Sequence, residues 1–187
     1  MALSSTRLEY RISLSHVERG VDLRENLIVA QHPSENAEHV TLRVLAWCLL
    51  HEERLEMAAG LADAEVADLW TKDLTGQLTT WVECGTADAD KLRKVLLHHS
   101  GIAAHAVLCD PRRLDELAAG IAEWKKPPRD ADLTVWTIDR ALVTALAARE
   151  ERRRTWTVTL VGGHAYIEAD GVSVDGAIES ARPLDGR

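Results

Sequence analysis

The order of strand-like and helix-like segments constrains this chain more than any other feature. Residues 7–17 place Leu8, Tyr10, Ile12 and Leu14 on one side, the period of two that indicates a half-buried strand. A turn at 18–20 and a second extended segment at 21–30 complete an opening hairpin. The remaining pattern predicts helices at 34–56, 88–99, 111–125 and 139–153, and strands at 77–84, 102–109 and 133–138. Residues 155–174 predict a closing hairpin that turns at Gly162-Gly163.

This order predicts an α/β fold with a mixed central sheet, in which helices join the strands of the middle section. No internal repeat, low-complexity tract or linker divides the sequence, so we expect residues 1–187 to form a single domain. A chain of this length buries about 70% of the surface that its unfolded form exposes, which is enough for a substantial core.

Charge and cysteine content narrow the functional classes. The formal net charge of −8 argues against a general nucleic-acid coat protein, because Lys and Arg supply nearly all non-specific affinity for phosphates, although a local basic groove is compatible with it. Cys48, Cys84 and Cys109 lie far apart without a CxxC pair, which favours reduced core thiols in a cytoplasmic protein. The alternating amino-terminal segment does not have the pattern of a signal peptide, and no apolar run reaches membrane-spanning length.

Two acids flank the segment KDLTGQLTTWVECG, residues 72–85, and suggest a divalent cation site. Asp73 and Glu83 would lie about 33 Å apart on an extended chain, so they can share an ion only if the chain folds back. Gly76 is a candidate for the bend. A two-residue turn centred on 75–76 would instead oppose Asp68 to Glu83 and Trp70 to Trp81. Asp73 is equally compatible with a solvent-exposed β-turn.

Six short motifs carry a family resemblance. They are HPSE at 32–35, RVLA at 43–46, ERLE at 53–56, DLWTKDLTG at 68–76, WVECG at 81–85 and LRK at 92–94. In this order the motifs resemble the YaeQ family, whose fold is a variant of the PD-(D/E)xK nuclease core, and the resemblance covers nearly the whole chain. It implies a restriction-endonuclease-like core with hairpins at both ends of the chain.

The resemblance also implies a metal site. Asp73 and Glu83 would be its ligand pair, with Asp68 as the reserve ligand. Mg²⁺ is the expected ion, because it takes one or two carboxylates together with substrate oxygens and waters. The lysine that the superfamily carries two residues after the second acid is replaced by Gly85.

A lysine from the next helix is the expected substitute for the one missing at position 85. The resemblance favours Lys94, whereas the helical wheel places Lys91 closer to the buried stripe and Lys94 on the opposite side. Both lysines are also compatible with an ordinary solvated helix face.

An acid on the first helix is the last element that the resemblance implies. Glu35 is the preferred match and Glu38 the second. Either acid is also explained by the favourable interaction of a carboxylate with a helix amino terminus. Arg43 is expected either to contact phosphate or to pair with Glu35 or Glu38.

Two functions follow from these expectations. The first is a Mg²⁺-dependent nuclease or phosphodiesterase that acts on DNA or RNA, with Asp73, Glu83 and one of the two lysines in its active site. The second is a catalytically inactive nuclease fold with a binding or regulatory role, which the absence of a lysine at position 85 favours. Nucleic acid is the expected partner, and no membrane association is expected.

Overall fold

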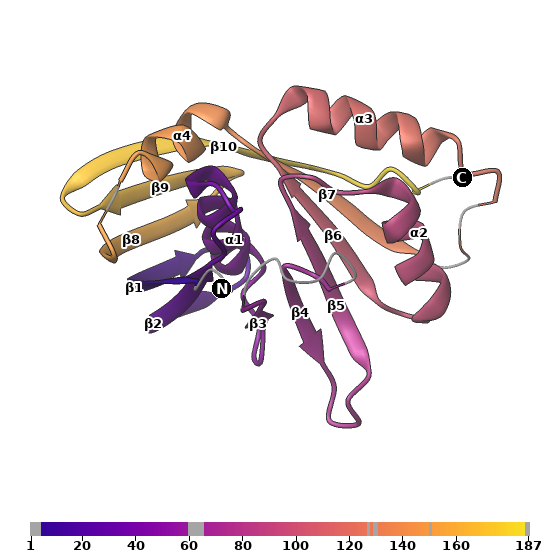
Figure 1. Ribbon diagram of the computed structural model, residues 1–187, viewed down its shortest axis with the longest axis horizontal. Helices are drawn as coiled ribbons and strands as arrows, with labels where there is room; N and C mark the ends of the chain where they lie inside the picture. The colour runs from indigo at the N-terminus through magenta and orange to yellow at the C-terminus, as the bar shows by residue number, and fades with distance from the viewer. Residues whose placement is uncertain (1–4, 60–65, 127, 129–130, 150, 186–187) are drawn as a thin grey trace.

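A computed structural model describes residues 5–59, 66–126, 128, 131–149 and 151–185 (Figure 1). Within these residues the chain forms four helices and ten strands. The helices are α1 (Ala37–Leu50), α2 (Ala89–His98), α3 (Pro111–Ala122) and α4 (Arg140–Ala147). The strands are β1 (Thr6–His16), β2 (Val21–Gln31), β3 (Glu56–Met57), β4 (Leu69–Lys72), β5 (Leu78–Cys84), β6 (Ala103–Leu108), β7 (Asp132–Ile138), β8 (Arg153–Val161), β9 (His164–Ala169) and β10 (Val172–Ala181).

All ten strands belong to one sheet with the order β2-β1-β8-β9-β10-β7-β6-β5-β4-β3. Strands β5, β6 and β7 are parallel to one another, as are β1 and β8, and the other neighbours are antiparallel. The predicted α/β fold with a mixed sheet is therefore confirmed. Helices α2 and α3 connect the parallel strands, which is the crossover connection that parallel pairs require.

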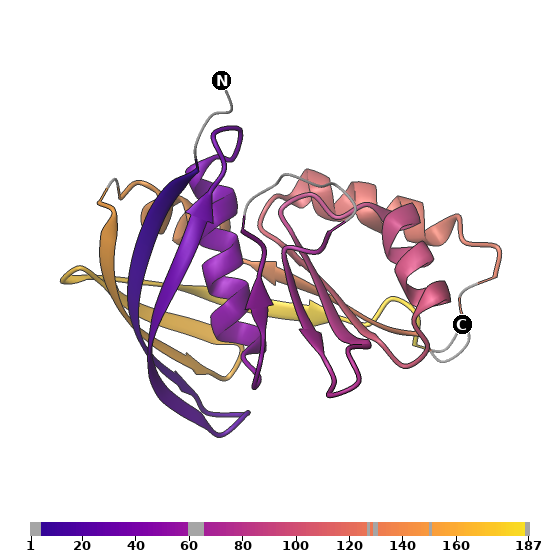
Figure 2. The ribbon, with the colours of Figure 1, turned by 60° about the horizontal axis from the view of Figure 1, so that its bottom comes forward.

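Strand β10 joins the two parts of the sheet, because residues 172–177 pair with β9 and residues 178–181 pair with β7. On one side of this joint, β1, β2, β8 and β9 curve around α1, and on the other side β4 to β7 carry α2 and α3 (Figure 2). Each part has its own apolar core. One core forms between α1, α4 and the curved strands, and the other between α2, α3 and strands β5 to β7.

Several predicted boundaries were wrong. The first helix begins after Asn36, because the Asn36 side chain, and not that of Ser34, accepts a hydrogen bond from the His39 amide. It ends at Leu50, six residues before the predicted end. The fourth helix ends at Ala147, six residues earlier than expected, and residues 153–161 are a strand. The closing segment holds three strands rather than two, because Asp170 and Gly171 both have positive φ and form a second tight turn.

Strands β3 and β4 were not predicted as separate strands. The predicted loop of residues 58–67 lies partly outside the described residues. The β4–β5 hairpin, however, has the Trp70–Trp81 pairing expected for a turn around residues 75–76, and Gly76 has a φ of 86° there. The three cysteines are buried and free, as expected. None of the described helices is long and apolar enough to cross a membrane.

Candidate functional site

The site forms where the amino-terminal end of α1 meets the base of the β4–β5 hairpin. The loop before α1 turns the Glu35 side chain inward, because its carboxylate accepts a hydrogen bond from the His32 amide at 3.2 Å. Glu35 is only 5% exposed although it is charged. A buried carboxylate needs partners, since burying an unpaired charge costs several kcal/mol.

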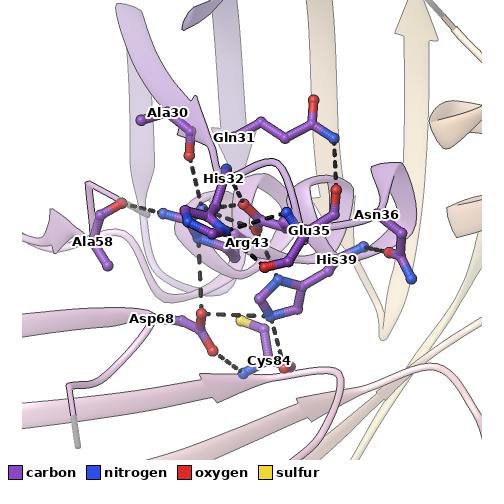
Figure 3. Close-up of polar contacts among 11 residues, drawn as sticks. Ala30, Gln31, His32, Glu35, Asn36, His39, Arg43, Ala58, Asp68 and Cys84 are labelled. Carbon is purple, nitrogen blue, oxygen red and sulfur yellow. Dashed lines mark hydrogen bonds and ion pairs between the residues drawn. The ribbon is translucent and has the colours of Figure 1, made fainter. Parts of the chain in front are cut away.

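Those partners stand on α1 at intervals of four residues. His39 Nδ1 lies 2.7 Å from Glu35 Oε1, and Arg43 Nη1 donates to the same oxygen at 3.0 Å (Figure 3). Arg43 is 1% exposed, and its guanidinium also donates to the carbonyl oxygens of Ala30 and Ala58. Glu35, His39 and Arg43 thus form one buried row that fixes α1 against β2 and the segment after β3.

Asp68 extends this row to the sheet. Its Oδ2 accepts a hydrogen bond from the Cys84 amide at 2.8 Å, and its Oδ1 lies 3.4 Å from His39 Nε2 and 3.9 Å from Arg43 Nε (Figure 3). His39 Nε2 also lies 3.0 Å from the Cys84 carbonyl oxygen. His39 therefore bridges two carboxylates and the carboxyl end of β5.

Glu83 lies at the base of the same hairpin. Leu69 pairs with Val82, but the Asp68 amide also donates to the Val82 carbonyl, so the regular register ends there. The Asp68 side chain contacts α1, whereas Glu83 contacts Lys91 of α2. The Glu83 Oε1 atom accepts hydrogen bonds from Trp81 Nε1 at 3.0 Å and from Lys91 Nζ at 2.7 Å. Lys91 also lies over the Trp81 ring, 5.4 Å from its centroid, which holds the ammonium group beside the carboxylate.

The protonation equilibria of the site follow from these contacts. Burial acts to lower the pKa of His39, but hydrogen bonds and charge from Asp68 and Glu35 outweigh it and raise the pKa to about 9. Burial acts to raise the pKa of Glu35, but His39 and Arg43 lower it overall. Burial raises the pKa of Glu83 in spite of Lys91 and Trp81. His39 is therefore cationic at neutral pH, and it lies between the side chains of Glu35 and Asp68.

Asp73 does not lie near Glu83. It begins the hairpin turn, where its amide donates to the Gln77 carbonyl and its Oδ1 accepts from the Thr75 and Gln77 amides. Gln77 and Glu83 are six strand residues apart, or about 20 Å, so one ion cannot contact both Asp73 and Glu83. Asp73 is the turn residue that the alternative interpretation described, and Asp68 is the acid that contacts the carboxyl end of β5, through the Cys84 amide.

The remaining predicted residues lie in four different environments. Lys91 contacts Glu83, whereas Lys94 is exposed and only its carbonyl forms a described contact, with His98 Nδ1. Glu38 accepts a hydrogen bond from the Thr144 hydroxyl at 3.0 Å and so ties α1 to α4. Arg43 pairs with Glu35, which was one of its two expected roles.

Position 85 has no room for the usual lysine. Gly85 has a φ of 75°, and a Cβ added there would lie 3.1 Å from His39 Cδ2. A side chain would combine a strained backbone with a close contact to the imidazole. The glycine therefore allows His39 to reach the carboxyl end of β5.

A cavity of about 340 Å³ opens beside this glycine, and Glu35, His39, Gly85 and Asp110 are among its lining residues. Within the described ranges, no group of three or more His, Cys, Asp or Glu side chains is arranged to hold a metal ion.

His39 is the site residue that sequence reasoning missed. The signal was available, because Glu35, His39 and Arg43 are spaced by four residues, and residues at this spacing lie on one side of a helix. The predictions for the first helix named only acids and an arginine, and so did not include His39.

The fold and the site together define a class of α/β proteins with a large mixed sheet and a buried ionic network between the first helix and a central hairpin. The sequence profile of the YaeQ protein family matches residues 1–177, and the chain belongs to this family.

Relatives and solved structures agree with this membership. The chain is 27% identical over 170 residues to a YaeQ protein of Salmonella typhi, covering 89% of this chain and 90% of the relative. It is 26% identical over 173 residues to that of Escherichia coli K12, covering 91% and 92%. The crystal structure of YaeQ from Xanthomonas axonopodis pv. citri matches with a TM-score of 0.85 and 27% identity over 96% of this chain and 99% of that one. The YaeQ structure from Pseudomonas syringae, 23% identical over 98% and 97% of the two chains, matches with a TM-score of 0.81 and supports the fold alone.

Proposed function

We propose that this protein is a divalent-metal-dependent phosphodiesterase that acts on DNA or RNA, with a divergent PD-(D/E)xK site on a restriction-endonuclease-like core. The observation that carries the proposal is the contact of Lys91 Nζ with Glu83 at 2.7 Å, next to Cys84, whose amide donates to Asp68 Oδ2 at 2.8 Å. An acid at the start of one strand, an acid at the end of the next and a lysine beside them are the three groups that the superfamily reaction uses. In this chain the lysine comes from α2 instead of position 85.

The two carboxylates fit a hard cation. The hydrogen bond from Trp81 and the ion pair with Lys91 both use Oε1 of Glu83, and Asp68 Oδ1 lies 3.4 Å from His39 Nε2 and 3.9 Å from Arg43 Nε. Mg²⁺ requires only one or two protein carboxylates when substrate phosphate and waters supply the remaining ligands. When bound there by Asp68 and Glu83, it would offset charge on the phosphoryl oxygens and activate a water.

The chain's own groups have separate roles in this proposal. Lys91 stabilises negative charge that develops near Glu83, because its ammonium group is already fixed there by the Trp81 ring. His39 and the Cys84 amide hold Asp68 in place from the other side. Glu35 acts through His39 and is a positioning residue.

The test combines metal binding with cleavage. Titration of Mg²⁺ or Mn²⁺ should raise the melting temperature of the wild type, since a ligand at about 100 times its Kd stabilises by about 2.7 kcal/mol. Asp68→Asn and Glu83→Gln should abolish both this stabilisation and the cleavage of labelled DNA or RNA. Lys91→Met should retain metal binding and lose most of the cleavage.

Asp73→Asn is the matched control, because it changes an acid of the same hairpin about 20 Å from Glu83. It should leave metal binding and cleavage as in the wild type. Absence of both metal stabilisation and cleavage in the wild type would reject the proposal, as would an equal loss in Asp73→Asn.

A second function is favoured by the charge balance of the site. Three acids, Glu35, Asp68 and Glu83, face three cations, His39, Arg43 and Lys91. A divalent cation would add charge to a network that is already neutral, which favours a fold that binds nucleic acid without cleaving it.

Fluorescence anisotropy with labelled oligonucleotides in EDTA tests this second function. Binding in EDTA whose affinity falls as salt rises, without metal stabilisation or cleavage, would support the binding role. An absence of binding at low salt would reject it.

A further inference from the structure

On one side, the parallel strands β5, β6 and β7 are covered by helices along their whole length. On the other side, helices cover only part of them. Under α2 and α3 the inward side chains of Trp81, Ala104, Ala106, Leu108, Leu133 and Val135 are apolar, and the buried Glu83 beside them is paired with Lys91 of α2. On the other side, the carboxyl halves of the strands are apolar and lie in the core beneath α1 and α4. The amino halves of that side carry Thr80, His105 and Thr134 instead.

The change from apolar to polar side chains along these strands coincides with the end of α1 at Leu50, which borders the polar region. Figure 2 shows α1 between β1 and β2 on one side and β3 and β4 on the other, with α2 and α3 across the sheet. Parallel strands in the middle of a sheet are normally covered by helices on both sides and are apolar on both. A polar surface on such strands, bare of described helices, is therefore a feature that the packing of the fold does not require.

This surface is the floor of a cavity of about 360 Å³. Arg19 and Glu52 line it from the β1–β2 turn and the segment after α1, and Asp132 and Arg182 line it from the edge formed by β7 and β10. The cavity lies at the amino halves of the strands, whereas Asp68 and Glu83 lie at the carboxyl end of β5. It is thus separate from the candidate metal site.

Three hydrogen-bond donors lie side by side across the floor. His105 pairs with Thr134 in the register of β6 and β7, and Ser180 pairs with Trp136, which places Arg182 beside Thr134. Trp136 Nε1 donates to His105 Nδ1 at 3.3 Å, so the neutral imidazole carries its proton on Nε2. Burial lowers the pKa of His105 to about 4, and the ring is therefore neutral at neutral pH.

The charges in the cavity limit what it can bind. Arg19 and Arg182 are balanced by Glu52 and Asp132, but the acids are not equally engaged. Glu52 Oε1 accepts hydrogen bonds from the Thr71 and Thr80 hydroxyls at 2.5 and 2.6 Å. Asp132 lies 4.0 Å from Arg182, at the limit of an ion pair, so a ligand carboxylate can replace it. The site therefore suits one negative charge better than the two of a phosphate monoester.

We propose that this cavity binds a small molecule with one carboxylate on a planar apolar body. The carboxylate accepts hydrogen bonds from Arg182, Thr134 and the His105 ring, and the planar body lies against Trp136. A guanidinium binds a carboxylate through two parallel hydrogen bonds, and an aromatic ring gives a flat ligand a large contact area. The proposal does not depend on the metal site or on any cleavage activity.

Ligand titrations followed by NMR test it, with benzoate as the probe and benzamide and inorganic phosphate as comparisons. The resonances to follow are the imidazole of His105 and the indole of Trp136, assigned with His105→Gln and Trp136→Phe. Benzoate should give saturable shifts of both with a Kd of about 1 mM, as expected for so small a ligand. Benzamide and phosphate should bind at least tenfold more weakly.

Variants then test whether benzoate binds in this cavity or elsewhere on the surface. Arg182→Met should weaken benzoate at least tenfold, because it removes a charge-assisted pair of hydrogen bonds. Asp132→Asn should tighten binding, because it removes the competing carboxylate. Arg153→Met, at an arginine whose side chain is 83% exposed, is the matched control and should change nothing. Equal binding of benzamide, unchanged binding in Arg182→Met, or no saturable shift at ten times the expected Kd would overturn the proposal.

Discussion

Two histidines show how differently the two ends of the same strands are built. His39 contacts the carboxyl end of β5 and lies between Glu35 and Asp68, which raise its pKa to about 9. His105 lies in the amino half of β6 beside Trp136, and burial lowers its pKa to about 4. The carboxyl end is thus a buried network in which each charge has a partner. At the amino end, the uncharged side chains of His105 and Thr134 line a cavity, and charged side chains lie around them.

Removal of Arg43 is expected to have the largest effect, because it breaks the network at its most buried cation. Arg43→Met leaves Glu35 buried with one partner fewer and should lower the free energy of unfolding by about 3–5 kcal/mol, measured by urea denaturation. Arg153→Met, at an exposed arginine paired with Glu9 at 3.3 Å, should cost about 1 kcal/mol or less. Similar losses in the two variants would show that the network does not carry the stability assigned to it.

Alkaline pH should lower the free energy of unfolding, because His39 loses its proton at the carboxyl end of the strands. Its folded pKa of about 9 lies above the ordinary histidine value of 6.5, so the stabilisation is complete below about pH 6.5 and is lost as the pH rises through 9. The shift corresponds to about 3 kcal/mol at most. Thermal or urea unfolding between pH 6 and 10 measures it, and His39→Gln should flatten the alkaline part of the curve. A curve of the same slope in His39→Gln would place the titration elsewhere.

Acid pH should also lower the free energy of unfolding, because His105 gains a proton at the amino end of the strands. The folded pKa of about 4 lies below the ordinary histidine value of 6.5, so the contribution is present above about pH 6.5 and is lost as the pH falls towards 4. Water in the adjoining cavity screens the ring, and we expect a loss of about 1–2 kcal/mol. Unfolding curves of the wild type and His105→Gln between pH 4 and 7 should diverge by that amount. Coincident curves would contradict the assignment.

The smallest effect is expected beyond the amino end of β5, at the tip of the hairpin. Asp73→Ala removes an exposed side chain that accepts hydrogen bonds from the Thr75 and Gln77 amides. Amide hydrogen exchange should become faster at these two residues and stay unchanged at Cys84, whose amide donates to Asp68. Faster exchange at Cys84 would show that tip and base are coupled.

Much of the framework could be predicted because its signals are local. The period of two in β1, the helix patterns and the Trp70–Trp81 pairing all depend on residues close in sequence. Strand β4 has only four residues and β3 only two, which is too short for a period to be recognised. Separation of β9 from β10 depends on one Asp-Gly turn inside an apparently continuous strand.

The candidate site was predictable residue by residue but not as a group. Glu35, Asp68, Glu83 and Lys91 were each singled out, yet Asp73 was preferred to Asp68, although only Asp68 contacts the carboxyl end of β5. The choice depended on which turn the hairpin makes, and the sequence allowed both. The polar floor around His105 was not predicted, because it requires knowing that α1 ends at Leu50 above those strands.

Strand β10 follows the other nine strands in chain order, and it pairs with β9 through its first half and with β7 through its second. During synthesis on the ribosome, both sub-assemblies can therefore form before the segment that unites them has emerged. Until then each exposes an unpaired strand, and a neighbouring nascent chain offers an identical replacement. Pairing of β10 with β7 and β9 closes both of these edges.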